Sequence, residues 1–364
     1  IKLILIMHNK KHIVIGLSGG VDSSVAAWLL KSQGHKVVGI FMKNWDDEDT
    51  DTYCTSKQDF LDAATAADVL GIEFDAVSFS KDYREKVFKD FLHEYSVGRT
   101  PNPDVFCNSE IKFKSFLKYS HDLGAKYIAT GHYSRTVIGD NGIHKLLKGC
   151  DENKDQSYFL HRLTQEQLSS SIFPLGKLKK KQVRDLAKEI GLPNAKKKDS
   201  TGICFIGERP FREFLSKYLK NNPGPICSLD GEKIGEHDGL SYYTIGQRKG
   251  IGIGGLSNNL TKKEYSQEPW FVVAKENPSN TLIVAQGHDN PHLLSPSLKA
   301  TNSSWVSGDS PTFNKIQAKI RYRQKTFSTF LTCKGNEFSL RFREPQWAVT
   351  PGQSAVIYNG LECL

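Results

Sequence analysis

The 364-residue chain lacks the features that mark membrane, secreted or zinc-stapled proteins. Its seven cysteines are irregularly spaced and include no CxxC pair, which argues against a disulfide framework and against structural zinc. No apolar run approaches the roughly 18 residues of a membrane helix, and no charged segment precedes a cleavable apolar stretch. We therefore expect a cytoplasmic protein with reduced thiols that does not engage a membrane.

Positive charge is concentrated in two segments. The net charge is +9, and residues 177–198 carry nine Lys or Arg against two acidic residues, whereas residues 315–343 carry eight against one. The rest of the chain is therefore net acidic, at −5. Such segments fit a polyanion such as a nucleic acid, because Lys and Arg release the counterions of phosphates. They also fit a solvated protein surface, and charge alone leaves both interpretations open.

The first part of the chain alternates between short apolar runs and amphipathic stretches of helical period. Strands separated by helices of this length predict right-handed βαβ units and an α/β fold with a parallel sheet. Ligands of such sheets bind at the carboxyl ends of the strands. The predicted strands are 12–17, 37–41, 74–79 and 127–130, and the predicted helices include 59–70, 111–123 and 177–191. We leave the six residues before Met7 out of this prediction.

Beyond residue 210, glycine and proline become frequent and short alternating segments replace helices, which predicts β-rich structure. We expect a catalytic domain over 7–209, a β-rich central domain over 210–285 and a C-terminal β-barrel over 286–364. In AKIRYRQK (318–325) every odd position is basic. A strand there would present a row of cations on one face.

The string SGGVDSS (18–24) lies between the first predicted strand and the first predicted helix. Its glycines allow a close backbone approach, Ser and Asp are expected to cap the helix, and the helix start favours an anion. It is not a Walker loop, because no Lys follows until Lys31. A cradle without Lys suits a pyrophosphate that leaves whole, which points to adenylation. An isolated Gly-Gly turn would be read as an ordinary capped turn, and the full string in this context favours the phosphate site.

SGGVDSS resembles the PP-loop pyrophosphatase superfamily, and further strings resemble one of its families, the tRNA-specific 2-thiouridylases. They occur in order over nearly the whole chain: FMKNWDDED (41–49), GRTPNPDVFCN (98–108), ATGHY (129–133), KDQSYFL (154–160), DSTGICFIGER (199–209), YYTIGQRKGIGIGG (242–255), EPWFVV (268–273) and AKIRYRQ (318–324).

The resemblance implies that the protein adenylates the C2 oxygen of the wobble uridine in tRNA and then replaces AMP with sulfur from a persulfide. Cys204 matches the persulfide carrier and Cys107 the catalytic nucleophile, with a Cys107–Cys204 disulfide left after each turnover. ATP would lie against the loop, with Mg²⁺ on its phosphates and Asp22 either a ligand of that ion or only a helix cap. The implied ATP-binding residues are Gly16, Leu17, Ser18, Gly19, Gly20, Val21, Asp22, Ser23, Met42 and Gly131.

The resemblance also implies an RNA surface. The target uridine must leave its stack to reach the adenylate, so base flipping is expected. Asp104 is in addition a candidate catalytic residue. The residues matched to the target base are Asn102, Pro103 and Asp104, and those matched to other tRNA contacts are Lys154, Asp155, Gln156, Arg321 and Tyr322. His132 and His161 receive no such role, and we expect them to be structural.

Two features depart from the family pattern. Asp104 stands three residues before Cys107, so the loop has DxxC where CxxC would supply a second cysteine ligand to a metal cluster. The chain stops after GLECL, where the family continues through a glycine-rich strand, so we expect an incomplete last strand.

Two rival functions remain open at this stage. One is another PP-loop enzyme, such as a tRNA lysidine synthetase or an amidotransferase-type synthetase, which needs no cysteine pair. The other is a non-catalytic RNA-binding module. The expected partners are tRNA and a sulfur-carrier or cysteine desulfurase relay protein, and we expect a monomer.

Overall fold

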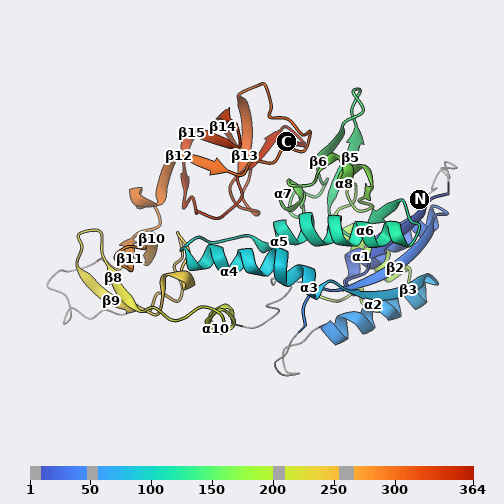
Figure 1. The fold of residues 1–364 in the computed structure, drawn as a ribbon, viewed down its shortest axis with the longest axis horizontal. Helices are drawn as coiled ribbons and strands as arrows, with labels where there is room; N and C mark the ends of the chain where they lie inside the picture. Colours follow the sequence, from blue (N-terminus) through green and yellow to red (C-terminus); the bar gives the residue numbers. More distant parts are fainter. Residues whose placement is uncertain (1–9, 47–55, 200–209, 254–265) are drawn as a thin grey trace.

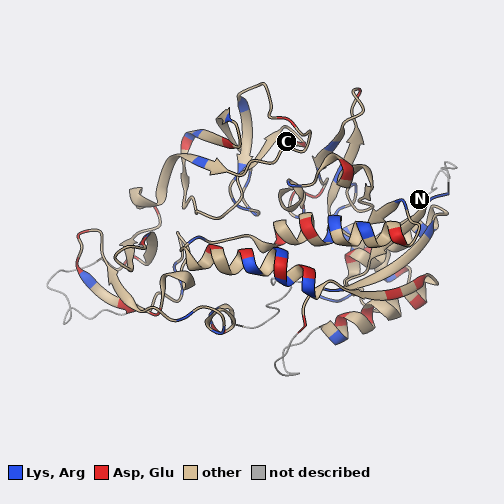
Figure 2. Cartoon of the chain, viewed as in Figure 1, with Lys and Arg blue, Asp and Glu red and all other residues tan. Residues whose placement is uncertain are grey.

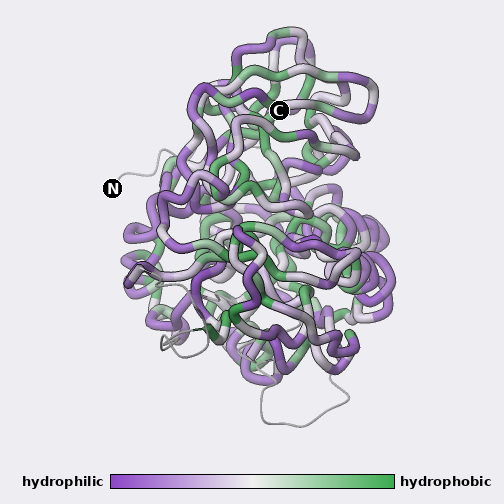
Figure 3. Tube along the Cα trace, turned by 90° about the vertical axis from the view of Figure 1, so that its left-hand side faces the viewer, coloured by the Kyte–Doolittle hydropathy of each residue, from purple (hydrophilic) through white to green (hydrophobic). Residues whose placement is uncertain are grey.

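The computed structural model describes residues 10–46, 56–199, 210–253 and 266–364 (Figure 1). Cys204, Cys54 and the residues around Met7 lie outside these ranges, so their predicted roles stay predictions. Hydrophobic segments gather inside the molecule and hydrophilic segments follow its outside (Figure 3). Within the described residues, no helix combines the length and apolar character that crossing a bilayer requires.

A five-stranded parallel sheet forms the first unit, in the order β3-β2-β1-β4-β7. Its strands are β1 (His12–Gly16), β2 (Lys36–Lys43), β3 (Glu73–Ser78), β4 (Tyr127–Ala129) and β7 (Ser171–Ile172). This is the predicted α/β fold, and the four predicted strands are present within one to two residues. The sheet forms because consecutive apolar side chains are buried on both of its faces, as in β1.

Helices cover both faces of this sheet. Ile13 and Ile15 pack with α1 (Val21–Ser32), α2 (Ser56–Leu70) and α9 (Lys180–Glu189). Val14, between them, faces the opposite side and packs with the helix that contains Phe113 and Phe116. This alternation follows from the two-residue period of a strand. The remaining short helices of this unit are α7 (Ser157–Leu160) and α8 (Gln165–Ser169).

Two long helical segments run from this sheet toward the rest of the molecule (Figure 1). The first consists of α3 (Ser80–Tyr83), η1 (Arg84–Phe88) and α4 (Lys89–Ser96), and the second of α5 (Pro103–Phe106), η2 (Cys107–Ser115) and α6 (Phe116–Asp122). The sequence predicted a helix only over 111–123. The observed helix starts at Pro103, which suits a first helical position because its missing N–H would be unpaired there in any case.

The second unit is a four-stranded sheet in the order β10-β11-β8-β9. Its strands are β8 (Gly224–Cys227), β9 (Lys233–His237), β10 (Trp270–Glu276) and β11 (Thr281–Gln286), with α10 (Phe211–Ser216) and η3 (Leu240–Tyr242) beside them. Its core is shared with the first helical segment, since Phe91 and Tyr95 pack in one cluster with Val272 and Val284.

The third unit is an eight-stranded sheet in the order β12-β15-β14-β13-β16-β17-β6-β5. Its strands are β5 (Ser134–Ile138), β6 (His144–Lys148), β12 (Leu294–Thr301), β13 (Lys315–Lys319), β14 (Phe327–Lys334), β15 (Glu337–Trp347), β16 (Val356–Asn359) and β17 (Glu362–Cys363), with η4 (Pro291–Leu293) before β12. The β5–β6 hairpin comes from the part of the chain predicted as the catalytic domain and pairs with β17. The predicted domain limits stay predictions. The third sheet extends across the limit predicted at residue 209, because β5 and β6 lie within the range predicted for the catalytic domain.

The predicted strand of alternating cations at 318–325 is wrong. β13 ends at Lys319, and residues 320–324 form bends and turns. Lys319 is buried instead of facing solvent, and its ammonium lies 3.3 Å from the Asp155 carboxylate. The alternation is interrupted because this internal ion pair and the packing of Ile320 draw the chain inward.

Candidate active site between the phosphate loop and the domain junction

The predicted phosphate loop connects β1 to α1. Gly19 has φ +72°, and a Cβ there would lie 2.3 Å from the carbonyl oxygen of Asp59, so only glycine fits. The Ser23 hydroxyl accepts a hydrogen bond from the Ser18 amide and donates one to the Gly20 carbonyl, which holds the turn closed. The first N–H groups of α1 are left for an anion.

The helix start is not capped as predicted. Gly20 is the N-cap residue, and neither Ser nor Asp makes a side-chain cap. Asp22 is in the first turn, where the helix dipole favours a negative charge, but its carboxylate is turned to other partners. Its role as a helix cap is therefore wrong.

The other predicted nucleotide residues meet at this loop. A Cβ on Gly16 would lie 2.7 Å from the Met42 Cε, and a Cβ on Gly131 would lie 2.8 Å from the Ser23 amide nitrogen. The end of β4 thus presses against the start of α1, which a side chain at Gly131 would prevent. The fold brings these segments together although they are far apart in the chain. Their role in binding ATP stays a prediction.

Asp22 belongs to an ionic cluster that sequence analysis missed. The Lys180 ammonium lies 2.7 Å from both Asp22 carboxylate oxygens and 2.7 Å from Asp199. The Tyr133 hydroxyl donates to Asp22 at 2.7 Å. Asp199 also pairs with Lys154 at 2.6 Å and with Arg184 at 2.8 Å. Although partial burial acts in the opposite direction, the hydrogen bonds and positive charges of Lys154 and Lys180 lower the pKa of Asp199 to about 2, so its carboxylate stays ionised.

Oxygen donors beside the loop fit a magnesium ion held on ATP phosphates. The Asn194 amide donates to the Gly19 carbonyl at 3.1 Å and to the Ser24 hydroxyl at 3.0 Å, while its own carbonyl oxygen is buried without a hydrogen-bond partner. Mg²⁺ commonly uses one or two carboxylates together with substrate phosphates and retained waters. Asp22 and the Asn194 oxygen suit that pattern. Within the described ranges, no group of three His, Cys, Asp or Glu could hold a metal ion by itself.

The predicted base-contacting residues lie at the start of the second helical segment. Asn102 precedes α5 and hydrogen-bonds the Tyr158 side chain, whose own hydroxyl donates to the Ser354 carbonyl at 2.9 Å. Burial raises the pKa of Asp104, and Lys112 offsets part of that effect. A carboxyl with a raised pKa is better suited to proton transfer near neutral pH.

Cys107 is buried, with 1% of its surface exposed, and begins the nine-residue π-helical segment η2. Wide helical turns of this kind often occur at functional sites. The same helix continues to Phe116, whose ring lies 3.7 Å from the position a Cβ would take on Gly16, the last residue of β1 before the phosphate loop. Phe116 directly follows η2, so Cys107 and this contact lie on one continuous helical segment.

Segments from all three units hold the loop that precedes Asn102. The Gln353 side chain donates to the Thr100 carbonyl at 2.7 Å, and the Thr100 amide donates to the Pro351 carbonyl at 2.9 Å. The Thr100 hydroxyl is 3.1 Å from that of Thr244. Gly352, with φ +94°, approaches Thr100 so closely that a Cβ would lie 2.8 Å from its backbone. The loop that leads into the predicted base-contacting residues, which we call the base-contacting loop (98–102), is therefore a junction of the three units.

The predicted tRNA-contacting residues differ in how buried they are and in the partners that they already bond within the protein. Lys154 is bonded to Asp199, and the Gln156 side chain accepts the Tyr133 amide at 2.9 Å. Asp155 is only 3% exposed, and its carboxylate bonds the Gly149 amide, the Ser157 amide and hydroxyl, and Lys319. In this structure Asp155 can shape the loop, but it cannot touch RNA, because it is buried and already bonded.

Arg321 and Tyr322 lie in the turn after β13. Arg321 donates to the Ile245 and Ala348 carbonyls at 3.1 and 2.8 Å, and therefore joins the second and third units. Its guanidinium also lies 5.4 Å from the Trp347 ring centroid. The Tyr322 ring centroid is 4.3 Å from that of Phe159. Arg321 thus has a structural task that the sequence did not indicate.

The two histidines have local partners. His132 Nδ1 is 2.8 Å from the Thr130 hydroxyl, and burial lowers the pKa of its ring well below the usual value. His161 Nδ1 is 2.9 Å from the Tyr158 carbonyl, and burial lowers its pKa to about 4. Both rings are therefore neutral at pH 7 and have the hydrogen bonds expected of structural residues.

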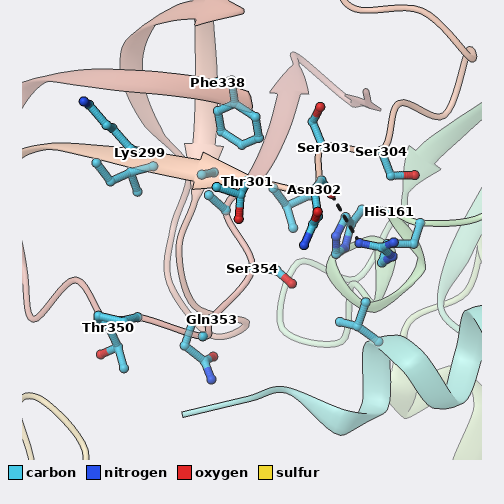
Figure 4. A pocket seen from close by; sticks show the side chains of 18 of the residues that line it. His161, Lys299, Thr301, Asn302, Ser303, Ser304, Phe338, Thr350, Gln353 and Ser354 are labelled. Carbon is cyan, nitrogen blue, oxygen red and sulfur yellow. Dashed lines mark hydrogen bonds between the residues drawn. The ribbon is translucent and has the colours of Figure 1, made fainter. Parts of the chain in front are cut away.

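A cavity of about 610 Å³ lies between the base-contacting loop and the C-terminal sheet. Figure 4 shows His161 beside Asn302 on one side, with Gln353 and Ser354 below Thr301 and Phe338. Pro101 and Phe106 line it from the other side, whereas no phosphate-loop residue does. The cavity is thus separate from the predicted ATP site and borders the loop at Pro101, although none of Asn102, Pro103 and Asp104 lines it.

The two basic segments contribute charge in different ways. Several of their cations are used inside the protein, among them Lys180, Arg184, Lys319 and Arg321. The exposed cations are Lys177, Lys179, Lys181, Lys188, Lys196 and Lys198 in the first segment and Lys315, Arg323, Lys325, Lys334, Arg341 and Arg343 in the second. On the two long helical segments, acidic and basic residues are interspersed (Figure 2).

Family profiles match the whole described architecture. A tRNA methyl transferase HUP domain matches residues 11–208, a tRNA methyl transferase PRC-barrel domain matches 212–286, and an aminomethyltransferase beta-barrel domain matches 295–364. A tRNA-specific 2-thiouridylase of Paracidovorax citrulli is 58% identical over 98% of this chain and 95% of its own. The chain belongs to the tRNA-specific 2-thiouridylase family. A relative of that name from Cupriavidus metallidurans is 57% identical over 97% of this chain and 98% of its own.

Family membership confirms the resemblance, the α/β fold followed by two β-rich units, and the sulfurtransferase class of enzyme. Among solved structures, the U34-tRNA thiolase NcsA from Methanococcus maripaludis, with its [4Fe-4S] cluster, is 21% identical over 58% of this chain and 66% of its own, at a TM-score of 0.37. The family assignment rests on the full-length relatives.

Proposed function

We propose that this protein carries out the ATP-dependent 2-thiolation of the wobble uridine in tRNA. The observation that carries the proposal is the helix from Pro103 to Asp122, which links the two halves of the site. Asn102 precedes its first residue, Asp104 and Cys107 lie at its start, and Phe116, further along, packs beside Gly16, the last residue of β1 before the phosphate loop. A nucleotide on the loop and a base at the helix start would therefore be held in a common frame.

In the first step the uracil C2 oxygen attacks the α-phosphate of ATP, forming an adenylated base and releasing pyrophosphate. The glycines and the α1 N-terminus would bind the phosphates, and Met42 would contact the adenine. Magnesium would neutralise phosphate charge, held by Asp22 and the Asn194 oxygen. Asp104, with its raised pKa, would accept the N3 proton of the base.

In the second step the terminal sulfur of a Cys204 persulfide attacks C2, and AMP leaves with the former C2 oxygen. The Cys107 thiolate then attacks the Cys204 sulfur, which releases the thiolated base and forms a Cys107–Cys204 disulfide. A dithiol reductant returns both cysteines to thiols, and a sulfur-carrier or cysteine desulfurase relay protein reloads Cys204. This chemistry suits a reducing cytoplasm and a monomer that binds one tRNA.

The remaining proposed residues bind the tRNA. The Tyr322 ring lies beside Tyr158, which hydrogen-bonds Asn102, whereas Lys154 and Gln156 bond Asp199 and Tyr133. Exposed cations of the two basic segments would hold phosphates. Arg321 would contribute to tRNA binding indirectly, by holding the second and third units together. The uridine would be flipped from its stack to reach Asn102 and Pro103.

The test is nucleoside mass spectrometry on unmodified tRNA incubated with the protein, ATP, Mg²⁺ and a persulfide donor. We expect 2-thiouridine that depends on ATP and is lost in Cys204→Ser. AMP release without thiolation would instead favour another PP-loop synthetase. Tight, salt-sensitive tRNA binding without ATP consumption would favour a non-catalytic RNA-binding module.

A further inference from the structure

The phosphate loop of this protein contains no cation of its own. Between Gly16 and Ser24 the only charged residue is Asp22, which is negative. Backbone N–H groups and the helix dipole supply only partial charges, equivalent to about half a unit at a helix start. A triphosphate placed there would meet a carboxylate in the first turn of α1, and a positive group from elsewhere in the fold would offset that negative charge together with the metal ion.

Lys180 is a cation that the fold places beside the first turn of α1. It is the first residue of α9, and α9 packs on α1 through Val183 and Ala187, which are buried in the same core as Val25. Its backbone amide donates to the Asp151 carboxylate at 2.8 Å, which fixes the start of the helix. Its side chain is only 12% exposed, and its ammonium bonds both oxygens of Asp22.

Lys180 lies in a network of alternating charges. Lys154, Lys180 and Arg184 face Asp22 and Asp199, and the Asp151 carboxylate accepts the Lys180 backbone amide, so these six described side chains sum to zero. The lowered pKa of Asp199 keeps that carboxylate charged, and the ammonium is thus held by two anions beside the α1 N-terminus. A phosphate bound at the start of α1 would compete with these carboxylates for the same ammonium.

A second observation points to a ligand at the same place. The buried Asn194 side chain bonds the Gly19 carbonyl and the Ser24 hydroxyl, and its carbonyl oxygen has no hydrogen-bond partner. A buried acceptor without a partner is costly, and a bound group that donates a hydrogen bond or a cation would satisfy it. Asn194 thus contacts the loop through its Nδ2 and keeps one buried acceptor that a bound ion or water could satisfy.

We propose that Lys180 is a phosphate-binding residue of the ATP site, and that it binds the β- and γ-phosphates and then the pyrophosphate that leaves. It takes the place of the lysine that a Walker loop carries within its own motif, and it reaches the loop from a helix 158 residues further along the chain. The inference rests on the proposed function, because it assumes that the loop binds ATP. In the absence of nucleotide the ammonium rests on Asp22 and Asp199.

The test compares the affinities of Lys180→Met for ATP, inorganic pyrophosphate and AMP, measured by calorimetry with Mg²⁺ present. We expect the Kd for ATP and for pyrophosphate to rise roughly 10- to 100-fold, as for the loss of a charge-assisted hydrogen bond. The Kd for AMP should change by less than about threefold, since AMP lacks the two outer phosphates. Lys181→Met is the matched control, because Lys181 is the next residue, carries the same charge and is exposed.

Lys180→Met leaves two carboxylates without their cation, so its folding is checked by thermal unfolding. The double variant Lys180→Met/Asp199→Asn removes one charge of each sign and should show the same selective loss of ATP affinity. Equal weakening of ATP and AMP, or an equal effect of Lys181→Met, would overturn the assignment of Lys180. A wild-type protein that binds ATP through Lys180 but forms no 2-thiouridine would overturn the proposed function alone.

Discussion

The ammonium of Lys319 lies 3.3 Å from the carboxylate of Asp155, and the two side chains are 9% and 3% exposed. This ion pair joins the end of β13 to the loop that carries Lys154 and Gln156. Asp155 also bonds two backbone amides, so the pair fixes the shape of that loop. A sequence motif predicted to touch RNA is in this way tied to the C-terminal sheet.

Breaking this pair from one side should destabilise the protein. Lys319→Met leaves a buried carboxylate without its cation, which typically costs about 3–5 kcal/mol. Urea unfolding should show the loss directly. Lys319→Met/Asp155→Asn should recover a large part of it, and Lys315→Met, on the exposed end of the same strand, should have little effect. Equal stability of Lys319→Met and the wild type would contradict the role of the pair.

Gly352→Ala should disturb the base-contacting loop. The added Cβ would lie 2.8 Å from the Thr100 backbone, at a glycine with φ +94°. Gly360→Ala is the matched control, because Gly360 has φ +60° and nothing within 4 Å of its Cβ position. Both variants carry backbone strain of about 1 kcal/mol. We expect kcat/KM for tRNA to fall on the order of tenfold more in Gly352→Ala than in Gly360→Ala. Similar values for the two variants would contradict the role of Gly352 in holding the base-contacting loop.

Cys107→Ser and Cys204→Ser should each reduce persulfide-supported thiolation by at least about a thousandfold, since a hydroxyl cannot replace the thiolate. ATP binding should be unchanged in both. Cys150→Ser serves as the control, because Cys150 is exposed and has no assigned role. Thiolation that survives either substitution would favour a PP-loop enzyme without a cysteine pair. Product is measured by nucleoside mass spectrometry.

Stability should fall as the pH drops from about 6.5 toward 4. Burial lowers the pKa of His161 from 6.5 to about 4, so in this window the unfolded chain binds a proton that the folded protein does not. The loss at pH 4 should be about 3 kcal/mol from this residue. Unfolding of His161→Gln across this range should depend less on pH. His93→Gln, at an exposed position, should keep the wild-type slope.

Much of the first unit follows from local pattern. The strands from β1 to β4 and helix α2 appear where apolar period and glycine stops predict them, because these signals act over neighbouring residues. The start of the helix at Pro103 was missed, since the segment 98–108 has the prolines of a loop. The string at 318–325 alternates like a strand, but burial of Lys319 against Asp155 ends β13 there.

The sequence by itself determined the phosphate loop, the positions of Cys107 and Cys204, and the family, because each lies in a continuous string of neighbouring residues. Only the tertiary structure decided that Lys180 reaches Asp22, that Gln353 and Gly352 hold Thr100, and that β17 completes a sheet with β6. The physical reason is the separation along the chain over which each interaction acts. A turn or helix start depends on adjacent residues, whereas an ion pair between residues 158 positions apart depends on how buried apolar faces bring two helices together.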